Sequence, residues 1–196
     1  MPEAAQFAVF IHLLGVCGIA GSSTGFLLVM SMMRRAKTVQ ELRAWSHLGA
    51  ISEQAYPFAT LVLLLSGGYM VQEGGPDVGS QVSFGDGWIM VSAIALVLMA
   101  VASLKINTLK MNAIHYAAEG VEGEAIPPAL AQQIKDPVLF AVTHAMSTGQ
   151  LGIIWNMTTR PGDAEAGIVV VLSVLVGVLS AAPMYARQQR MIEGAG

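Results

Sequence analysis

The sequence predicts an all-α integral membrane protein, a helical bundle of five transmembrane helices with the N-terminus outside and the C-terminus cytoplasmic. Only 12% of the residues are charged and 54% are hydrophobic, whereas globular domains carry about 25% charged residues. Five intervals between the charged clusters approach or exceed the roughly 20 residues that a helix needs to cross about 30 Å of hydrocarbon. They lack the alternation typical of a barrel, so helices are expected. A single transmembrane domain, 1–196, should hold spans at about 6–33, 54–72, 87–104, 137–158 and 166–186.

The first span differs from a signal peptide, because it has no basic start and Arg34 and Arg35 follow it without a small-residue cleavage site. We therefore expect it to remain in the mature protein. Cys17, the one cysteine, lies inside this span, where packing is its expected role.

The connections after the first and third spans contain helical patterns of their own. Leu42, Trp45 and Leu48 recur at helical spacing, so 36–52 is expected to form a short amphipathic helix on the cytoplasmic surface. The third span should continue to about residue 118 before Gly120 ends it. Residues 119–136 are expected to be a loop with one helical turn.

The charges predict the orientation. If the spans alternate, nine basic residues fall on one side and only Arg160 on the other, and basic residues mark the cytoplasmic side. A four-span arrangement, with 137–159 as a surface helix, would separate Arg187 and Arg190 from the other basic residues, so it fits less well. The fourth span is the most polar, which favours an interior position.

His12 in the first span and His144 in the fourth are the candidate metal ligands. Each lies beside small residues, which are Gly15 and Gly18 for His12 and Thr148 and Gly152 for His144. Haem iron takes imidazole ligands and the porphyrin plate needs small neighbours, so all six are candidate cofactor-binding residues for haem b. The alternative is ordinary helix packing by glycines and neutral histidines.

The depths of the two histidines bear on whether they share a site. His12 belongs to the outer half of its span and His144 to the inner half, so their depths differ by roughly 10 Å or more at 1.5 Å per residue. This offset favours two sites, or one haem with another second ligand. Met30, Met99, Met146 and Met157 could supply a sulfur ligand, although packing is the commoner role of such residues.

His47 and His115 lie near the cytoplasmic surface, with Glu53 and Tyr56 at the entrance of the second span. They indicate either solvated histidines or a proton or quinone-headgroup site. No nucleotide-binding glycine loop, zinc spacing or nucleophile elbow occurs in the sequence. We therefore expect no soluble-enzyme chemistry and no nucleic-acid partner.

Several short stretches together resemble a family of small, largely uncharacterised bacterial membrane proteins. They are Ile11-His12-Leu13-Leu14-Gly15 with the Arg34-Arg35 exit, Tyr56-Pro57 through Ser66-Gly67-Gly68, Gly87-Trp88, and Thr159-Arg160-Pro161-Gly162. The family resembled is related to copper-resistance protein D and to the membrane-bound protoporphyrinogen oxidase. The resemblance implies a multi-pass protein of the bacterial cytoplasmic (inner) membrane.

The oxidase branch implies a role for His12, because its matching first-span histidine is associated with haem b and catalysis. That branch carries a lysine shortly after the Gly-Trp pair. Ser92 stands at the corresponding place here, which argues against protoporphyrinogen oxidation. Copper-resistance relatives imply copper movement, but the sequence has no evident outer cluster of histidine and methionine.

Three functions follow as expectations. The first is a b-type haem-binding membrane protein with a redox or electron-transfer role, exchanging electrons with a quinone in the lipid bilayer. The second is a non-enzymatic accessory subunit that packs against other membrane subunits or forms a homo-oligomer. The third is transport of copper or another small solute.

Overall fold

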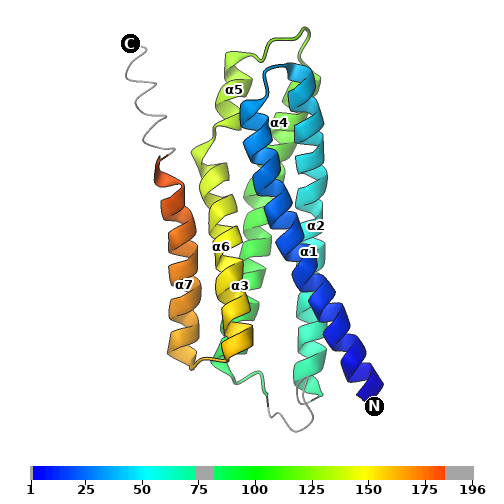
Figure 1. Ribbon diagram of the computed structural model, residues 1–196, viewed down its shortest axis with the longest axis vertical. Coiled ribbons are helices and arrows are strands. Elements are labelled where there is room, and N and C mark those ends of the chain that lie inside the picture. The colour runs from blue at the N-terminus through cyan, green and yellow to red at the C-terminus, as the bar shows by residue number, and fades with distance from the viewer. Residues whose placement is uncertain (1, 74–81, 184–196) are drawn as a thin grey trace.

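Long helices make up nearly all of the computed structural model, which describes residues 2–73 and 82–183 (Figure 1). No strand occurs in these two ranges. The helices are α1 (Pro2–Arg35), α2 (Val39–Gln72), α3 (Gly87–Ala102), the π-helix η1 (Ser103–Thr108), α4 (Leu109–Glu119), α5 (Pro128–Ile134), α6 (Pro137–Thr159) and α7 (Asp163–Ser180).

Five helical stretches of the described chain are long and apolar enough to cross a membrane, as the sequence predicts. The third is continuous from Gly87 to Glu119 through η1, which confirms that it extends past residue 104. Gly120 is its C-cap. At 33 residues it is about 50 Å long, so it exceeds the roughly 30 Å of hydrocarbon by about 20 Å.

The five stretches run alternately up and down, so the start of α1 and the end of α7 lie at opposite ends of the bundle (Figure 1). The fifth helix begins at Asp163, three residues before the predicted start. Its predicted end at residue 186 falls outside the described residues. Which end faces the cytoplasm stays a prediction from the charge distribution.

The prediction of a separate surface helix over 36–52 is wrong. This segment is the first half of α2, which begins after the Thr38 N-cap and continues to Gln72. Leu42 and Ser46 are fully buried, because this half packs against α1 and α4 and not against a lipid surface. The amphipathic pattern therefore reports burial within the bundle.

The end of the bundle that holds α5 has a hydrophobic core of its own. Side chains from α1, α2, α4, α5 and α6 contribute to it, among them Phe26, Leu42, Met111, Leu130 and Leu139. Arg43 of α2 closes the end of α4 by donating to the carbonyls of Ala118, Glu119 and Val121. The predicted helical turn in 119–136 is α5.

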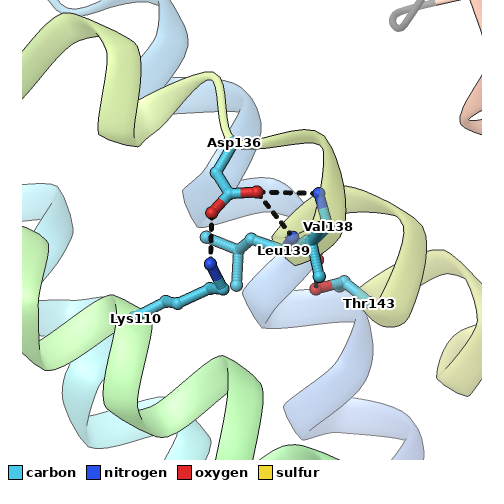
Figure 2. A network of polar contacts seen from close by, with 5 residues as sticks. All are labelled: Lys110, Asp136, Val138, Leu139 and Thr143. Atoms are coloured by element: carbon cyan, nitrogen blue, oxygen red, sulfur yellow. Dashed lines mark hydrogen bonds and ion pairs between the residues drawn. The ribbon is translucent and has the colours of Figure 1, made fainter.

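Asp136 joins α4 to the start of α6 (Figure 2). One carboxylate oxygen pairs with the Lys110 ammonium group, and the other accepts from the backbone N–H groups of Val138 and Leu139. Asp136 is thus the N-cap of α6, the residue type that satisfies the free amides of a first turn.

The fourth stretch is an interior helix, as its polarity predicts. α6 contacts α1, α3, η1 and α7, and its side chains Thr143, Gln150 and Asn156 are buried. α7 is the least buried of the five stretches. A face of apolar side chains on α7 is exposed, as expected for contact with lipid: Ile168, Val171, Leu172, Leu175, Val176 and Leu179.

Candidate functional site

His12 is held in one orientation by α2. Its Nδ1 lies 3.1 Å from the Ser66 hydroxyl, which itself donates to the Val62 carbonyl at 2.6 Å. Because the Ser66 hydrogen is used in that bond, His12 Nδ1 is the donor to the Ser66 oxygen. Nε2 of the ring is then the unprotonated nitrogen, with its lone pair available to a ligand.

Gly67 allows the His12 ring to approach α2. A Cβ at this position would lie 3.3 Å from the Cε1 atom of the ring, closer than ordinary van der Waals contact. The sequence Ser66-Gly67 therefore provides both the hydrogen-bond partner of His12 and the space for its ring. Sequence reasoning included these two residues in the family resemblance without giving either a role.

His12 borders two adjoining cavities. The larger has a volume of about 320 Å³ and extends to Trp88 and Arg160. The smaller, about 290 Å³, extends to Gln150. Five residues line both cavities and form the wall between them: His12, Leu13, Leu63, Leu96 and Met157.

The lining is apolar apart from a few groups at defined places. His12 and Met157 offer a nitrogen and a sulfur atom within the shared wall. Arg160 has left-handed backbone geometry, with φ of 50°, as the C-cap of α6, and its guanidinium carbon lies 5.8 Å from the centre of the Trp88 ring. An apolar cavity with few polar groups is the usual form of a small-molecule site.

His144 lies elsewhere in the bundle. Its Nδ1 lies 3.0 Å from the Phe140 carbonyl, and its ring packs on the Phe140 ring with 3.8 Å between centroids. It borders neither cavity of His12. Met157 lies 13 positions further along α6, which is roughly 20 Å of helix. The predicted difference in depth between the two histidines is therefore present, and they form no common site.

The small residues beside the histidines are used for helix packing. A Cβ at Gly15 would lie 2.8 Å from Cγ of Leu63, and one at Gly18 would lie 3.1 Å from Cβ of Ala59. These two glycines therefore face α2 at close contact, where no room is left for a porphyrin plate. A Cβ at Gly21 or Gly25, further along α1, would have no neighbour within 4 Å.

The small residues near His144 on α6 are also used for helix packing. A Cβ at Gly152 would lie 2.7 Å from the Ser173 hydroxyl oxygen of α7. Thr148 donates to the His144 carbonyl and lies against Gly177 of α7. Thr148 and Gly152 thus form the contact between α6 and α7, and the packing alternative accounts for them.

A second polar group lies deeper in the bundle. Glu53 accepts a hydrogen bond of 2.8 Å from Ser103 of η1, and it is only 3% exposed. The sequence alone places Glu53 at the entrance of the second span and does not identify Ser103 or Asn107. The spacing of these two polar residues, four apart in an apolar helix, is the signal that could have identified them.

This architecture defines a multi-pass helical integral membrane protein with an open, mostly apolar cavity that His12 borders. The chain belongs to the family described as predicted integral membrane protein (DUF2269), whose model matches residues 6–161. The match covers His12 and every residue that borders the two cavities. No curated protein and no solved structure matches the chain.

The predicted membership of an uncharacterised membrane-protein family is confirmed. The family description mentions neither copper-resistance protein D nor protoporphyrinogen oxidase. That part of the resemblance stays a prediction, as do haem b, quinone and the bacterial inner membrane.

Proposed function

We propose that this protein binds haem b in the cavities beside His12 and has a redox role in the bacterial cytoplasmic membrane. One observation carries the proposal. A histidine whose Nδ1 is already engaged by Ser66 borders two open apolar cavities between membrane-spanning helices. Ionisable side chains within membrane spans usually have functional roles.

The residues present fit a haem group in three respects. Haem-ligating imidazoles commonly donate their second ring N–H to a neighbouring group, as His12 does. Met157 borders the same two cavities, and methionine with histidine is an established pair of haem ligands. Arg160 at the end of the larger cavity offers a cation for the carboxylates of haem.

A bound haem would supply one-electron chemistry. The chain itself would supply the ligand orientation through Ser66, the exclusion of water through the apolar lining, and the compensating charge through Arg160. A quinone is the expected partner, because a lipid-soluble electron carrier can reach the exposed apolar surface of the bundle from the bilayer.

Two other functions stay predictions. They are a non-enzymatic accessory subunit in a larger assembly or homo-oligomer, and a transporter of copper or another solute. In residues 2–73 and 82–183 no group of three or more His, Cys, Asp or Glu side chains is placed to hold a metal ion. No contact in the described structure favours either function over haem binding.

The structure provides a matched pair of variants for the test. Purified from haem-replete cells, the wild-type protein should show a Soret band and a pyridine haemochrome. His12→Ala should lose both, whereas His144→Ala should keep them because His144 borders neither cavity. Circular dichroism of each variant checks that the helices are intact. A colourless wild-type protein, or equal loss in both folded variants, would contradict the proposal.

A further inference from the structure

Glu53 is a buried acid without an opposite charge. The described residues provide it with no ion-pair partner, and Lys105 of the adjoining π-helix is exposed. Tyr56 is a titratable group on which Glu53 acts electrostatically. The neighbouring polar side chains of α1 and α6, Ser23 and Gln150, are uncharged. A buried carboxyl group in this position is least costly when it holds a proton.

The π-helix brings two partners to Glu53. η1 makes a wider turn than an α-helix, and Ser103 and Asn107 on it are both buried. The Ser103 hydroxyl donates to the Glu53 carboxylate. The Asn107 side chain lies close enough to influence that carboxylate, and its Nδ2 donates to Met146 Sδ at 3.6 Å. π-turns within long helices occur frequently at functional sites.

Both partners can serve either protonation state of the carboxyl group. A hydroxyl donates or accepts, and a side-chain amide does either after a half-turn about its last torsion, whereas a protonated carboxyl must donate one O–H. The oxygen Oδ1 of Asn107 is buried and accepts no hydrogen bond from the described residues. Asn107 itself is only 1% exposed, so this unused acceptor is available to a protonated Glu53.

A line of polar residues runs from Glu53 toward the cavities of His12. Tyr56 lies one turn further along α2 and is adjacent to Gln150. Gln150 donates to Ser23 at 2.6 Å and also lines the smaller cavity. Glu53 therefore lies two side chains away from the space that borders His12.

We propose that Glu53 is a proton-binding site inside the bundle, in which Ser103 and Asn107 hold the carboxyl group in both its neutral and its ionised form. The ligand is a single exchangeable proton, taken up on a carboxylate oxygen and released from it. Proton binding at Glu53 does not depend on whether the protein binds haem. If the proposed function also holds, the polar line through Tyr56 and Gln150 would connect this proton to the redox centre.

Infrared difference spectroscopy across a pH titration tests this site. The wild-type protein in detergent should show the C=O stretch of one buried protonated carboxyl group per chain, which shifts in D₂O and disappears reversibly as pH rises. Glu53→Gln should lose this band. Glu119→Gln, which alters an exposed acid at the end of α4, should retain it.

Two further variants separate the possible results. Asn107→Ala should shift the band by removing a hydrogen-bond partner, and His12→Ala should leave it in place even if haem is lost. Failure of this proposal is therefore distinguishable from failure of haem binding. A band that persists in Glu53→Gln, that never exchanges in D₂O, or that is absent from the wild type at every pH would overturn the proposal.

Discussion

His12 Nδ1 on α1 and Ser66 Oγ on α2 lie 3.1 Å apart, although 54 positions separate the two residues in the sequence. The contact joins α1 and α2. These two helices pack against each other extensively, and among the other helix pairs only α6 and α7 pack to a similar extent. The contact also determines which ring nitrogen of His12 is available to a ligand. The orientation of the imidazole is thus a property of the α1–α2 interface.

Removing the Ser66 hydroxyl should weaken haem binding without abolishing it. Loss of a partner that orients a metal-ligating histidine typically costs 10-fold to 100-fold in affinity, so Ser66→Ala should lower the haem affinity by about that factor. Spectrophotometric titration of the haem-free protein measures it. Ser52→Ala removes another hydroxyl of α2, which bonds within its own helix to the Leu48 carbonyl, and should have no effect. Equal affinities for Ser66→Ala and wild type would show that the hydroxyl does not support the ligand.

The contact between α6 and α7 should be sensitive to one methyl group. A Cβ at Gly177 would lie 2.5 Å from the His144 carbonyl oxygen and 2.6 Å from the Ala145 Cα. Because both are backbone atoms, Gly177→Ala should force the helices apart and destabilise the fold by about 1–3 kcal/mol. The thermal unfolding midpoint in detergent should fall accordingly.

Gly167 on the same helix is the control, since nothing lies within 4 Å of a Cβ there. Gly167→Ala should leave the midpoint unchanged or raise it, because alanine favours a helix by up to about 1 kcal/mol over glycine. Similar midpoints for the two variants would argue against the close approach of α7 to α6.

The sequence predicts the number of spans and several helix ends, because both depend on local properties, although α2 begins at Val39 and not at residue 54. The hydrocarbon thickness requires runs of apolar residues, and Gly120 and Asp136 act on the helix ends next to them. The face that each helix presents to its neighbours depends instead on packing between distant segments. Glu53 and Ser103 meet across 50 positions, and nothing near either residue indicates that contact.

The sequence alone could not distinguish the two histidines as candidate ligands. His12 and His144 each have small residues one turn away, so the local pattern supports both equally. Packing separates them: α2 places Ser66 and Gly67 at His12, whereas α7 covers the small residues that follow His144. Leu42 illustrates the converse case, because its amphipathic segment is buried by α1 and α4 and so forms no surface helix.

The ion pair in Figure 2 should make stability depend on pH in a defined direction. Burial, the largest single influence, raises the pKa of Asp136, but Lys110 and the amides of Val138 and Leu139 outweigh it and hold the pKa below its ordinary value. A lowered pKa in the folded state means that the stabilisation is complete above the unfolded value of about 4. It is lost as pH falls through the folded value.

Two variants divide the contribution of Asp136. Asp136→Asn retains an N-cap side chain and loses the charge, whereas Asp136→Ala loses both and should cost about 1 kcal/mol more. Unfolding is followed by circular dichroism between pH 3 and 7. The stabilities of wild type and Asp136→Asn should approach each other toward the acid end as the ion pair is lost, whereas Asp136→Ala should stay less stable because it lacks the N-cap. A gap between wild type and Asp136→Asn that widens on acidification would contradict the sign.

The membrane orientation can be measured with single cysteines. Cys17 is the one cysteine of the chain, so Cys17→Ala gives a background without thiols. Glu3→Cys near the start of α1 and Glu122→Cys between α4 and α5 then introduce exposed thiols at opposite ends of the bundle (Figure 1). Both positions lie outside the apolar segments, so neither change should disturb helix packing.

Positive residues remain on the cytoplasmic side, and the end of the bundle with Lys110, Lys135 and Arg43 should therefore face inward. A membrane-impermeant maleimide added to intact spheroplasts should label Glu3→Cys at once. It should label Glu122→Cys only after the membrane is permeabilised. The reverse order would place the His12 cavities in the cytoplasmic half of the membrane, and any redox partner of His12 would then have to approach from that side.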